Sequence, residues 1–147
     1  MKKDHAYFMT LAMKLALKAK GMTSPNPLVG ALVVKNGRII GRGFHKKAGF
    51  AHAEVVALDE AGEKAKGATL YVTLEPCPMC AGAIVLSRIP LLIFGAYDPK
   101  AGACSSLYTI TNDTRLNHRV HTIGGILEEE CGSVLKDFFK LHRLRKD

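Results

Sequence analysis

The apolar residues of the chain recur with a helical period in some segments and form short continuous runs in others. The first segment shows the helical period, with Asp4 placed to cap a helix and Gly21 placed to end it. Its apolar positions are Phe8, Leu11, Ala12, Leu15 and Ala19. This pattern predicts an amphipathic helix at the start of the chain.

A hairpin is predicted next. The run LVGALVV, residues 28–34, is continuous and rich in β-branched side chains, which indicates a buried strand. Asn36-Gly37 is a dipeptide typical of a two-residue hairpin turn. Residues 38–45, RIIGRGFH, then return as the partner strand.

The rest of the chain alternates between helices and strands. The patterns predict strands over 68–75, 91–97 and 119–127, and helices over 52–62, 77–88 and 128–146. A polar connection over 98–118 joins the last two strands, with a short helix near Leu107. Such alternation predicts a mixed sheet with helices on both faces.

Length and charge narrow the picture. The 147 residues fit one compact domain, and no linker interrupts them, so we expect a single domain over residues 1–147. The net charge of +8 suits nucleic acid or a phosphorylated small molecule, and equally a merely basic enzyme. Positive charge without acidic partners gathers at the end of the last predicted helix, where we expect contacts with phosphates from Lys140, Arg143, Arg145 and Lys146.

The first residues are basic and then apolar, like a signal peptide in outline. Lys14, Lys18 and Lys20 interrupt the apolar part, and no small-residue cleavage site follows. The apolar runs elsewhere end well before membrane-spanning length. We therefore expect a soluble cytoplasmic protein with no membrane partner, in which the cysteines form no disulfide framework.

The stretch LEPCPMC carries Cys77 and Cys80, placed between a predicted strand and a predicted helix. The two thiols are three positions apart, so they share one face of the first helical turn. A helix N-terminus stabilises thiolates, which bind metals and attack disulfides. This stretch alone is therefore compatible with a redox dithiol as well as with a metal site.

The stretch AHAEV, which precedes LEPCPMC, favours a metal. His52 lies 25 residues before Cys77 (52 to 77), and with the two cysteines it makes three ligands suited to zinc. Three ligands leave a position open for water, whereas a structural site needs a fourth ligand. Cys104 and Cys131 form no second pair of this kind and are expected to be buried, unreactive thiols.

Glu54 completes the pattern H-x-E followed by P-C-x-x-C, which is typical of zinc-dependent nucleobase deaminases. Zinc lowers the pKa of water from about 15.7 to roughly 7 and so makes hydroxide available. Glu54 is close enough to His52 to carry protons from the water to the ring nitrogen and to the departing ammonia. Two rivals remain, a redox CxxC protein and an RNA-binding module with a vestigial site; the intact Glu54 argues against the second.

The chain resembles the cytidine deaminase superfamily, and its second half resembles the bacterial tRNA-specific adenosine deaminases. The matching stretches are LYVTLEPCPMCAGAIVLSRI, GAYDPKAGA, LNHRV and the terminal FFKLHRLRK. The resemblance implies a three-layer α/β/α cytidine deaminase-like fold with a five-stranded mixed sheet, one Zn²⁺ per chain and a homodimer. It implies His52, Cys77 and Cys80 as zinc ligands, Glu54 as the proton shuttle and a flipped wobble adenosine of tRNA as the substrate.

The first half is similar instead to the deaminase of riboflavin biosynthesis, which acts on a phosphoribosylated aminopyrimidine. The stretches that carry this likeness are TSPNPLVGALVV and GRGFHKKAGFAHAEVVALDEAGEKAKGATLYVTLEPC. Six residues separate His45 from His52, as in the riboflavin enzyme, whereas the tRNA enzymes usually have an Asn in place of His45 and a longer loop. The short spacing between Cys77 and Cys80 follows the tRNA enzymes.

Three residues are candidate substrate contacts: Asn26, His45 and Asn117, the last from the tRNA family's Asn-His pair. Asn26 could instead hold the SPNP turn, and His45 could simply end a strand. Phe138 and Phe139 either face tRNA or belong to the core. We expect His45 to contact a ribose hydroxyl or a phosphate of the substrate.

The sequence therefore predicts a zinc-dependent hydrolytic deaminase, with adenosine in tRNA as the first candidate substrate. The alternative is a small-molecule deaminase for a phosphoribosylated aminopyrimidine, a nucleotide, or a free base such as guanine or cytosine.

Overall fold

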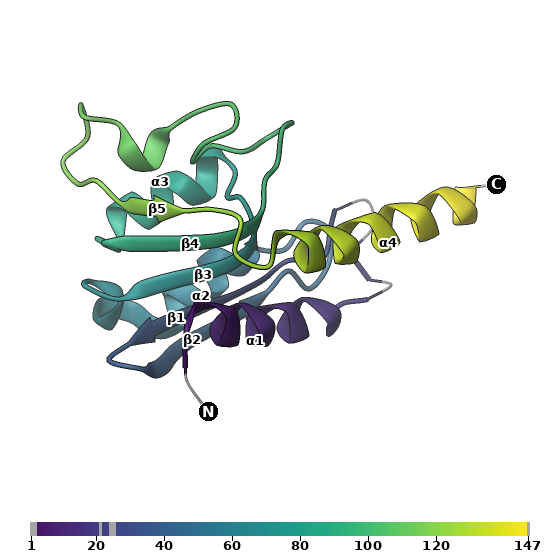
Figure 1. Ribbon diagram of the computed structural model, residues 1–147, viewed down its shortest axis with the longest axis horizontal. Helices are drawn as coiled ribbons and strands as arrows, with labels where there is room; N and C mark the ends of the chain where they lie inside the picture. The colour runs from purple at the N-terminus through teal and green to yellow at the C-terminus, as the bar shows by residue number, and fades with distance from the viewer. Residues whose placement is uncertain (1–2, 21, 24–25, 147) are drawn as a thin grey trace.

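The structure, a computed structural model, describes residues 3–20, 22–23 and 26–146, with side chains in the last helix described up to residue 137. A five-stranded mixed sheet lies between two layers of helices (Figure 1). In chain order the elements are α1 (His5–Leu17), β1 (Gly30–Lys35), β2 (Arg38–Phe44), α2 (Ala53–Ala61), η1 (Gly62–Ala65), β3 (Thr69–Leu74), α3 (Pro78–Leu86), β4 (Leu91–Ala96), η2 (Ile110–Asn112), β5 (His121–Ile123) and α4 (Glu128–Lys146). The predicted three-layer α/β/α fold is confirmed.

The strand order is β2-β1-β3-β4-β5. β1 runs antiparallel to β2 and β3, whereas β3, β4 and β5 are parallel. The Asn36-Gly37 turn joins β1 to β2, and both residues have positive φ, 52° and 76°, as a type I′ hairpin turn requires. The crossover from β3 to β4 contains α3, so the carboxyl end of β3 leads directly into the CxxC helix.

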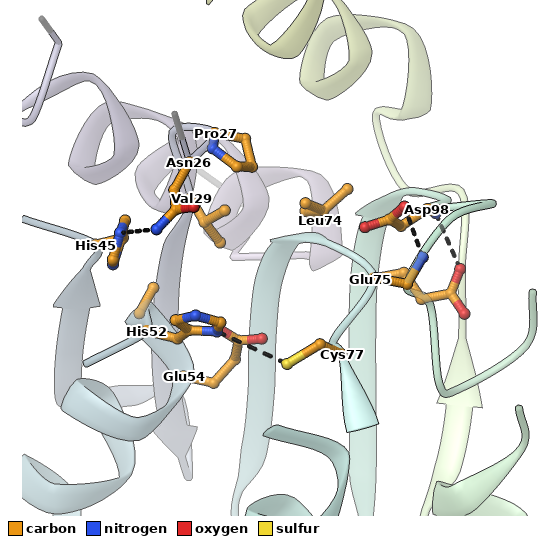
Figure 2. A pocket seen from close by; sticks show the side chains of 12 residues that line it. Asn26, Pro27, Val29, His45, His52, Glu54, Leu74, Glu75, Cys77 and Asp98 are labelled. Carbon is orange, nitrogen blue, oxygen red and sulfur yellow. Dashed lines mark hydrogen bonds between the residues drawn. The ribbon is translucent and has the colours of Figure 1, made fainter. Parts of the chain in front are cut away.

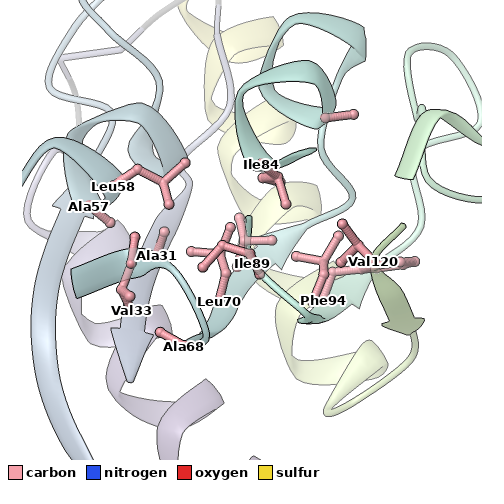
Figure 3. Close-up of a cluster of buried hydrophobic side chains, with 14 of the residues drawn as sticks. Ala31, Val33, Ala57, Leu58, Ala68, Leu70, Ile84, Ile89, Phe94 and Val120 are labelled. Carbon is pink, nitrogen blue, oxygen red and sulfur yellow. The ribbon is translucent and has the colours of Figure 1, made fainter. Parts of the chain in front are cut away.

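Alternate side chains of the strands enter two cores. On one face α2 and α3 cover Ala31, Val33, Leu70, Val72 and Phe94 (Figure 3). On the other face α1 and the start of α4 cover Leu32, Val34, Tyr71 and Ile93. This period of two follows from the pleat of the strands, and each face of the sheet is buried by its own pair of helices.

The element boundaries differ from the predictions at three places. Asp4 caps α1 as expected, through a bond from the Tyr7 N–H, but regular α-helix ends at Leu17. Beyond it the chain tightens into i→i+3 bonds up to Lys20, which satisfies the last carbonyl groups. Gly21, the predicted end, lies outside the described residues.

The other two differences concern the second half of the chain. β5 covers only His121–Ile123 of the predicted 119–127, because the backbone N–H groups of Gly125 and Ile126 bond to the carbonyls of Gly95 and Phe94 in a loop that leads to α4. The short helix expected near Leu107 is a 3₁₀ turn over Ile110–Asn112.

Candidate metal centre and active site

Two helices begin at the candidate site. His52 is the N-cap of α2 and Cys77 is the N-cap of α3, and neither cap uses its side chain to bond the helix backbone. Both side chains are therefore free to act elsewhere. Cys80 is fully buried in the first turn of α3, behind Pro78, which starts the helix with a residue suited to that position.

Small residues fix α2 against the sheet. An added Cβ at Gly41 would lie 2.2 Å from the carbonyl oxygen of Ala57, and one at Gly43 would lie 2.2 Å from that of Ala53. α2 thus packs directly on the backbone of β2. This close contact determines where the first turn of α2, with His52 and Glu54, meets the start of α3.

His52, Cys77 and Cys80 form one cluster, with their ligand atoms within 4.8 Å of one another. The Nδ1 atom of His52 lies 3.7 Å from the Cys77 sulfur and 3.4 Å from the Cys80 sulfur. Tetrahedral zinc with bonds of about 2.3 Å to sulfur and about 2.05 Å to nitrogen separates such ligands by about 3.6 Å. The two observed distances fall on either side of that value, so these residues fit a zinc ion.

The surroundings shift the pKa values of the two cysteines in opposite directions. A hydrogen bond from Cys80 lowers the pKa of Cys77 to about 5, with nearby His52 adding to the effect. That same hydrogen bond, together with burial, raises the pKa of Cys80. Cys77 is accordingly a thiolate at neutral pH, which is the form that binds zinc.

Glu54 is the second residue of α2 and is only 3% exposed. Burial raises the pKa of its carboxyl group to about 7. Figure 2 shows its side chain beside His52 and Cys77. A carboxyl group with a pKa near neutrality both accepts and donates a proton readily, as general acid–base catalysis requires.

A cavity of about 180 Å³ opens over these groups. In Figure 2 one wall comes from residues between α1 and β1 and from the end of β2, and the opposite wall from the end of β3 and the loop after β4. The lining residues are Asn26, Pro27, Val29, His45, His52, Ala53, Glu54, Leu74, Glu75, Cys77, Asp98 and Ala101.

Asn26 and His45 form a hydrogen-bonded pair in the first wall. His45 is buried, and its Nδ1 atom lies 3.2 Å from the carbonyl oxygen of Ala51, to which it must donate. The Nε2 atom is then the acceptor for the Asn26 amide, at 3.1 Å. Both ring nitrogens of His45 thus have partners inside the protein, and among the described residues no donor bonds to the amide oxygen of Asn26.

Five of the seven predicted site residues line this cavity, and Cys80 lies beside them in the metal cluster. Asn117 does neither; it is exposed on the connection between β4 and β5 and is not among the lining residues. Cys104 and Cys131 are buried away from the cluster, and burial raises their pKa values to about 12 and about 11. The side chains of Phe138, Phe139 and the basic end of α4 lie outside the described residues.

Sequence reasoning gave no role to Glu75 and Asp98. Glu75 is 2% exposed and is the hydrogen-bond acceptor for the loop after β4. Burial raises the pKa of its carboxyl group, but hydrogen bonds from Ser106, Asp98 and Cys104 outweigh that effect and lower it. The sequence signal that could have indicated a role for Glu75 was its position, as a carboxylate between a predicted buried strand and the CxxC motif.

The family model for the cytidine and deoxycytidylate deaminase zinc-binding region matches residues 2–96. The chain is 45% identical to the tRNA-specific adenosine deaminase of Bacillus subtilis, over 99% of this chain and 94% of that protein. It is 48% identical to the riboflavin biosynthesis protein RibD of Aquifex aeolicus, over 90% of this chain but only 38% of that protein.

A solved structure from work on A-to-I editing by tRNA:A34 deaminases, at the wobble position of transfer RNA, is also similar. It superposes with a TM-score of 0.75 at 36% identity, and the match covers 88% of this chain and 99% of that one.

Proposed function

Because the chain belongs to the family with the cytidine and deoxycytidylate deaminase zinc-binding region, it is a hydrolytic deaminase, and we propose that it converts adenosine to inosine at the wobble position of tRNA. The observation that supports this substrate most directly is the likeness to a tRNA-specific adenosine deaminase along nearly the whole length of both chains. The net charge of +8 suits a polyanionic substrate.

His52, Cys77 and Cys80 would hold the zinc ion, which serves as a Lewis acid and lowers the pKa of water to about 7. Glu54 takes a proton from the attacking water and delivers it to the ring nitrogen next to the amino-bearing carbon. It passes the second proton of the water to the amino group. The carbon–nitrogen bond then breaks, ammonia leaves, and the ring keeps the oxygen as a carbonyl group.

The helix starts favour this chemistry. Glu54 lies in the first turn of α2, where the helix dipole stabilises its charged form, while burial opposes that form. The balance leaves the carboxyl group able to take and return a proton within one catalytic cycle. Because the carboxyl group is buried at the base of the cavity, bulk water does not compete for those protons.

We assign substrate contact to the Asn26 amide oxygen, which can accept a hydrogen bond from a sugar hydroxyl or an amino group. His45 would act through Asn26, because both of its own nitrogens are already bonded. The direct contact of His45 with ribose or phosphate stays a prediction that would require one of these two bonds to break, and a substrate contact of Asn117 stays a prediction too.

A second candidate is deamination of a phosphoribosylated aminopyrimidine. It is favoured by the 48% identity to RibD and by the short segment from His45 to His52, which resembles that enzyme. A short loop leaves less protein to wrap a nucleotide within RNA. The Asn26–His45 pair would serve either substrate.

The deciding experiment offers both substrate classes to the zinc-loaded protein. One arm uses a tRNA with adenosine at the wobble position and measures inosine; the other uses ribosylated aminopyrimidines, nucleotides and free bases, and measures ammonia. Glu54→Ala is the control in each arm. Turnover in the small-molecule arm alone would overturn the tRNA assignment, and no turnover in either would overturn both candidates.

We also propose a homodimer. Met79 and Leu86 are seven positions apart on α3, so they share one helix face, and they are 60% and 79% exposed. Large apolar side chains in such a position are typical of an interface. A second copy is the partner that the resemblance to the tRNA enzymes implies.

The proposed location is the cytoplasm, where the tRNA substrate would be found. The four cysteines are free thiols, as in a reducing compartment. Within the described part of the chain, no helix combines the length and the apolar character needed to cross a membrane.

A further inference from the structure

We infer that Glu75 is a positioning residue: it couples the turn that carries Cys77 to the cavity wall formed by residues 98–106. This inference rests on the proposed function, because it assigns Glu75 a part in holding the substrate. Glu75 itself is not placed to exchange protons with the substrate, since its carboxylate points into the loop (Figure 2).

The carboxylate of Glu75 gathers donors from both ends of the loop. Its Oε1 atom accepts the backbone N–H of Asp98 at 3.1 Å and the hydroxyl of Ser106. Its Oε2 atom accepts the backbone N–H groups of Cys104 at 3.2 Å, Ser105 at 2.8 Å and Ser106 at 2.8 Å. One side chain thus holds the loop at its beginning and at its end.

The loop also fits closely around this carboxylate. An added Cβ at Gly102 would lie 2.4 Å from the carboxyl carbon of Glu75 and 2.5 Å from the backbone oxygen of Asp98. Only a residue without a side chain allows the loop to fold over the carboxylate at this point. The loop conformation and the presence of Glu75 therefore depend on each other.

The backbone around Glu75 extends the connection to the metal ligands. The N–H of Glu75 donates to the carbonyl of Ala96 at 2.8 Å, and the N–H of Ala103 donates to the carbonyl of Pro76 at 2.8 Å. Pro76 directly precedes Cys77. The zinc-ligand turn and the loop are thus joined by side-chain and backbone bonds over a few residues.

The positioned loop supplies one wall of the cavity. Asp98 and Ala101 line it, and Figure 2 shows Asp98 on the side opposite Asn26. The Asp98 carboxylate accepts the N–H groups of Lys100 at 3.0 Å and Ala101 at 3.1 Å, so the two lining residues form one turn. The bond from the Asp98 N–H to Glu75 fixes that turn relative to the metal ligands.

The chemistry of these bonds requires a carboxylate. All five partners donate, and an ionised carboxylate only accepts. In Glu75→Gln the amide oxygen can replace Oε2 and serve its three N–H donors. The amide NH₂ would then face the N–H of Asp98, while the Ser106 hydroxyl could turn and accept. This substitution should release the Asp98 end of the loop selectively.

The test compares Glu75→Gln with two controls. Ser106→Ala removes one donor but leaves the Asp98 bond, and Ile93→Val makes a small cavity in the core on the other face of the sheet. For each zinc-loaded protein we would measure zinc content, thermal midpoint, amide hydrogen exchange over residues 98–106, and kcat and KM on a substrate that the wild type converts.

We expect Glu75→Gln to keep one zinc per chain, to exchange faster around residue 98 and to raise KM by about ten- to a hundredfold, with a smaller fall in kcat. Ser106→Ala should raise KM only a few-fold. Ile93→Val should lower the thermal midpoint and leave KM unchanged. If Glu75→Gln fails to fold, Ser106→Ala still tests the inference. In that variant, faster hydrogen exchange over residues 98–106 must be accompanied by a raised KM.

Faster exchange with an unchanged KM would overturn the inference, as would loss of zinc from Glu75→Gln. Hydrogen exchange does not need turnover, so the coupling of Glu75 to the loop is measured even if the wild type converts neither tRNA nor the small molecules. In that case the proposed function and the substrate-holding role fail together. If instead the wild type is active but Glu75→Gln shows unchanged hydrogen exchange over residues 98–106, only the role of Glu75 is overturned.

Discussion

His52 and Glu54 lie two positions apart at the start of α2, yet they meet different partners. The imidazole faces two sulfur atoms, whereas the carboxyl group is buried in the floor of the cavity, where burial raises its pKa. Removal of the His52 side chain should therefore affect zinc binding, whereas removal of the Glu54 side chain should affect the catalytic rate. Zinc content and catalytic rate can be measured separately, which makes the two roles testable.

Glu54→Ala should keep its zinc and its fold and lose activity by several powers of ten, because proton transfer to the leaving group is removed. Cys80→Ser should lose zinc, because it replaces a soft ligand in a fully buried position. Metal analysis and single-turnover rates check both. Loss of metal from Glu54→Ala, with metal kept in Cys80→Ser, would contradict the assignment.

The Asn26–His45 pair leads to a double-mutant prediction. Asn26→Ala should raise KM about tenfold through the loss of one hydrogen bond to the substrate. His45→Ala should have a smaller effect of the same kind, because Asn26 would lose its orientation. If His45 acts only through Asn26, the double variant should match Asn26→Ala. Additive effects would instead indicate that His45 contacts the substrate directly.

The cluster of His52, Cys77 and Cys80, which is placed to bind a metal ion, could be predicted from the sequence because each part of its pattern is local. Cys77 and Cys80 share a helical turn, and His52 and Glu54 share another. Glu75 and Asp98 could not be assigned in the same way, because their roles depend on hydrogen bonds between segments about 23 to 31 positions apart. No spacing rule covers such bonds.

At the scale of elements, the contact between β2 and α2 has little freedom to change. Gly41 and Gly43 allow the helix to approach the strand so closely that backbone atoms touch. Because the start of α2 carries His52 and Glu54, packing at this strand is transmitted to the site. Sequence patterning predicted both β2 and α2 but not the short distance between them, which is possible because Gly41 and Gly43 have no side chains.

Gly43→Ala should therefore reduce stability by roughly 1–3 kcal/mol, because the new methyl group meets the Ala53 carbonyl. It should also lower kcat/KM by displacing the first turn of α2. Gly132→Ala is the matched control: in the part of the chain that the structure describes, no atom beyond the neighbouring residues and the backbone of its own helix lies within 4 Å of the added Cβ. Alanine in a helix interior should stabilise the protein by about 0.5–1 kcal/mol. Urea unfolding measures both changes; equal stability of the two variants would contradict the prediction.

Helix ends were less predictable than helix positions. α1 was expected to continue to Gly21, but its regular α-helical bonds stop at Leu17. The residues beyond it have good helical propensity, so only the i→i+3 bonds of the structure reveal the change. β5 is shorter than the apolar segment that predicted it, because the loop after it bonds to the backbone of β4 without continuing the regular strand pairing.

At the scale of the whole molecule, α4 extends beyond the sheet, as Figure 1 shows. Its first turn contains Glu128, Glu129 and Glu130, whose negative charges are stabilised by the positive end of the helix dipole. Its last turns contain the basic residues of KLHRLRK. We expect this basic end of the chain to contact the phosphates of a polyanion.

Binding of tRNA should weaken steeply with salt, with a log–log slope of about 0.7–0.9 per phosphate contacted. Truncation after Phe139 should lower that slope, because it removes Lys140, Arg143, Arg145 and Lys146. Filter binding over a salt series gives the slope. If the truncated protein shows the slope of the full chain, the last turns of α4 make no phosphate contacts.

The proposed dimer predicts a concentration-dependent mass. Leu86→Asp should shift the protein to monomer in analytical ultracentrifugation, because it places a charge within the apolar face of α3. Leu17→Asp, at a 47% exposed position on α1, is the control and should leave the mass unchanged. A wild type that sediments as a monomer at all concentrations would contradict the dimer.

The metal ligands and the cavity walls belong to different parts of the architecture. His52, Cys77 and Cys80 are carried by the starts of two helices packed on the sheet, whereas the walls come from loops at its edge. In evolutionary terms, loops can be lengthened, shortened or exchanged while the reaction centre is inherited intact. A lineage built in this way acquires new substrates by small insertions and deletions, so enzymes for a nucleic acid and for a vitamin precursor can descend from one catalytic ancestor.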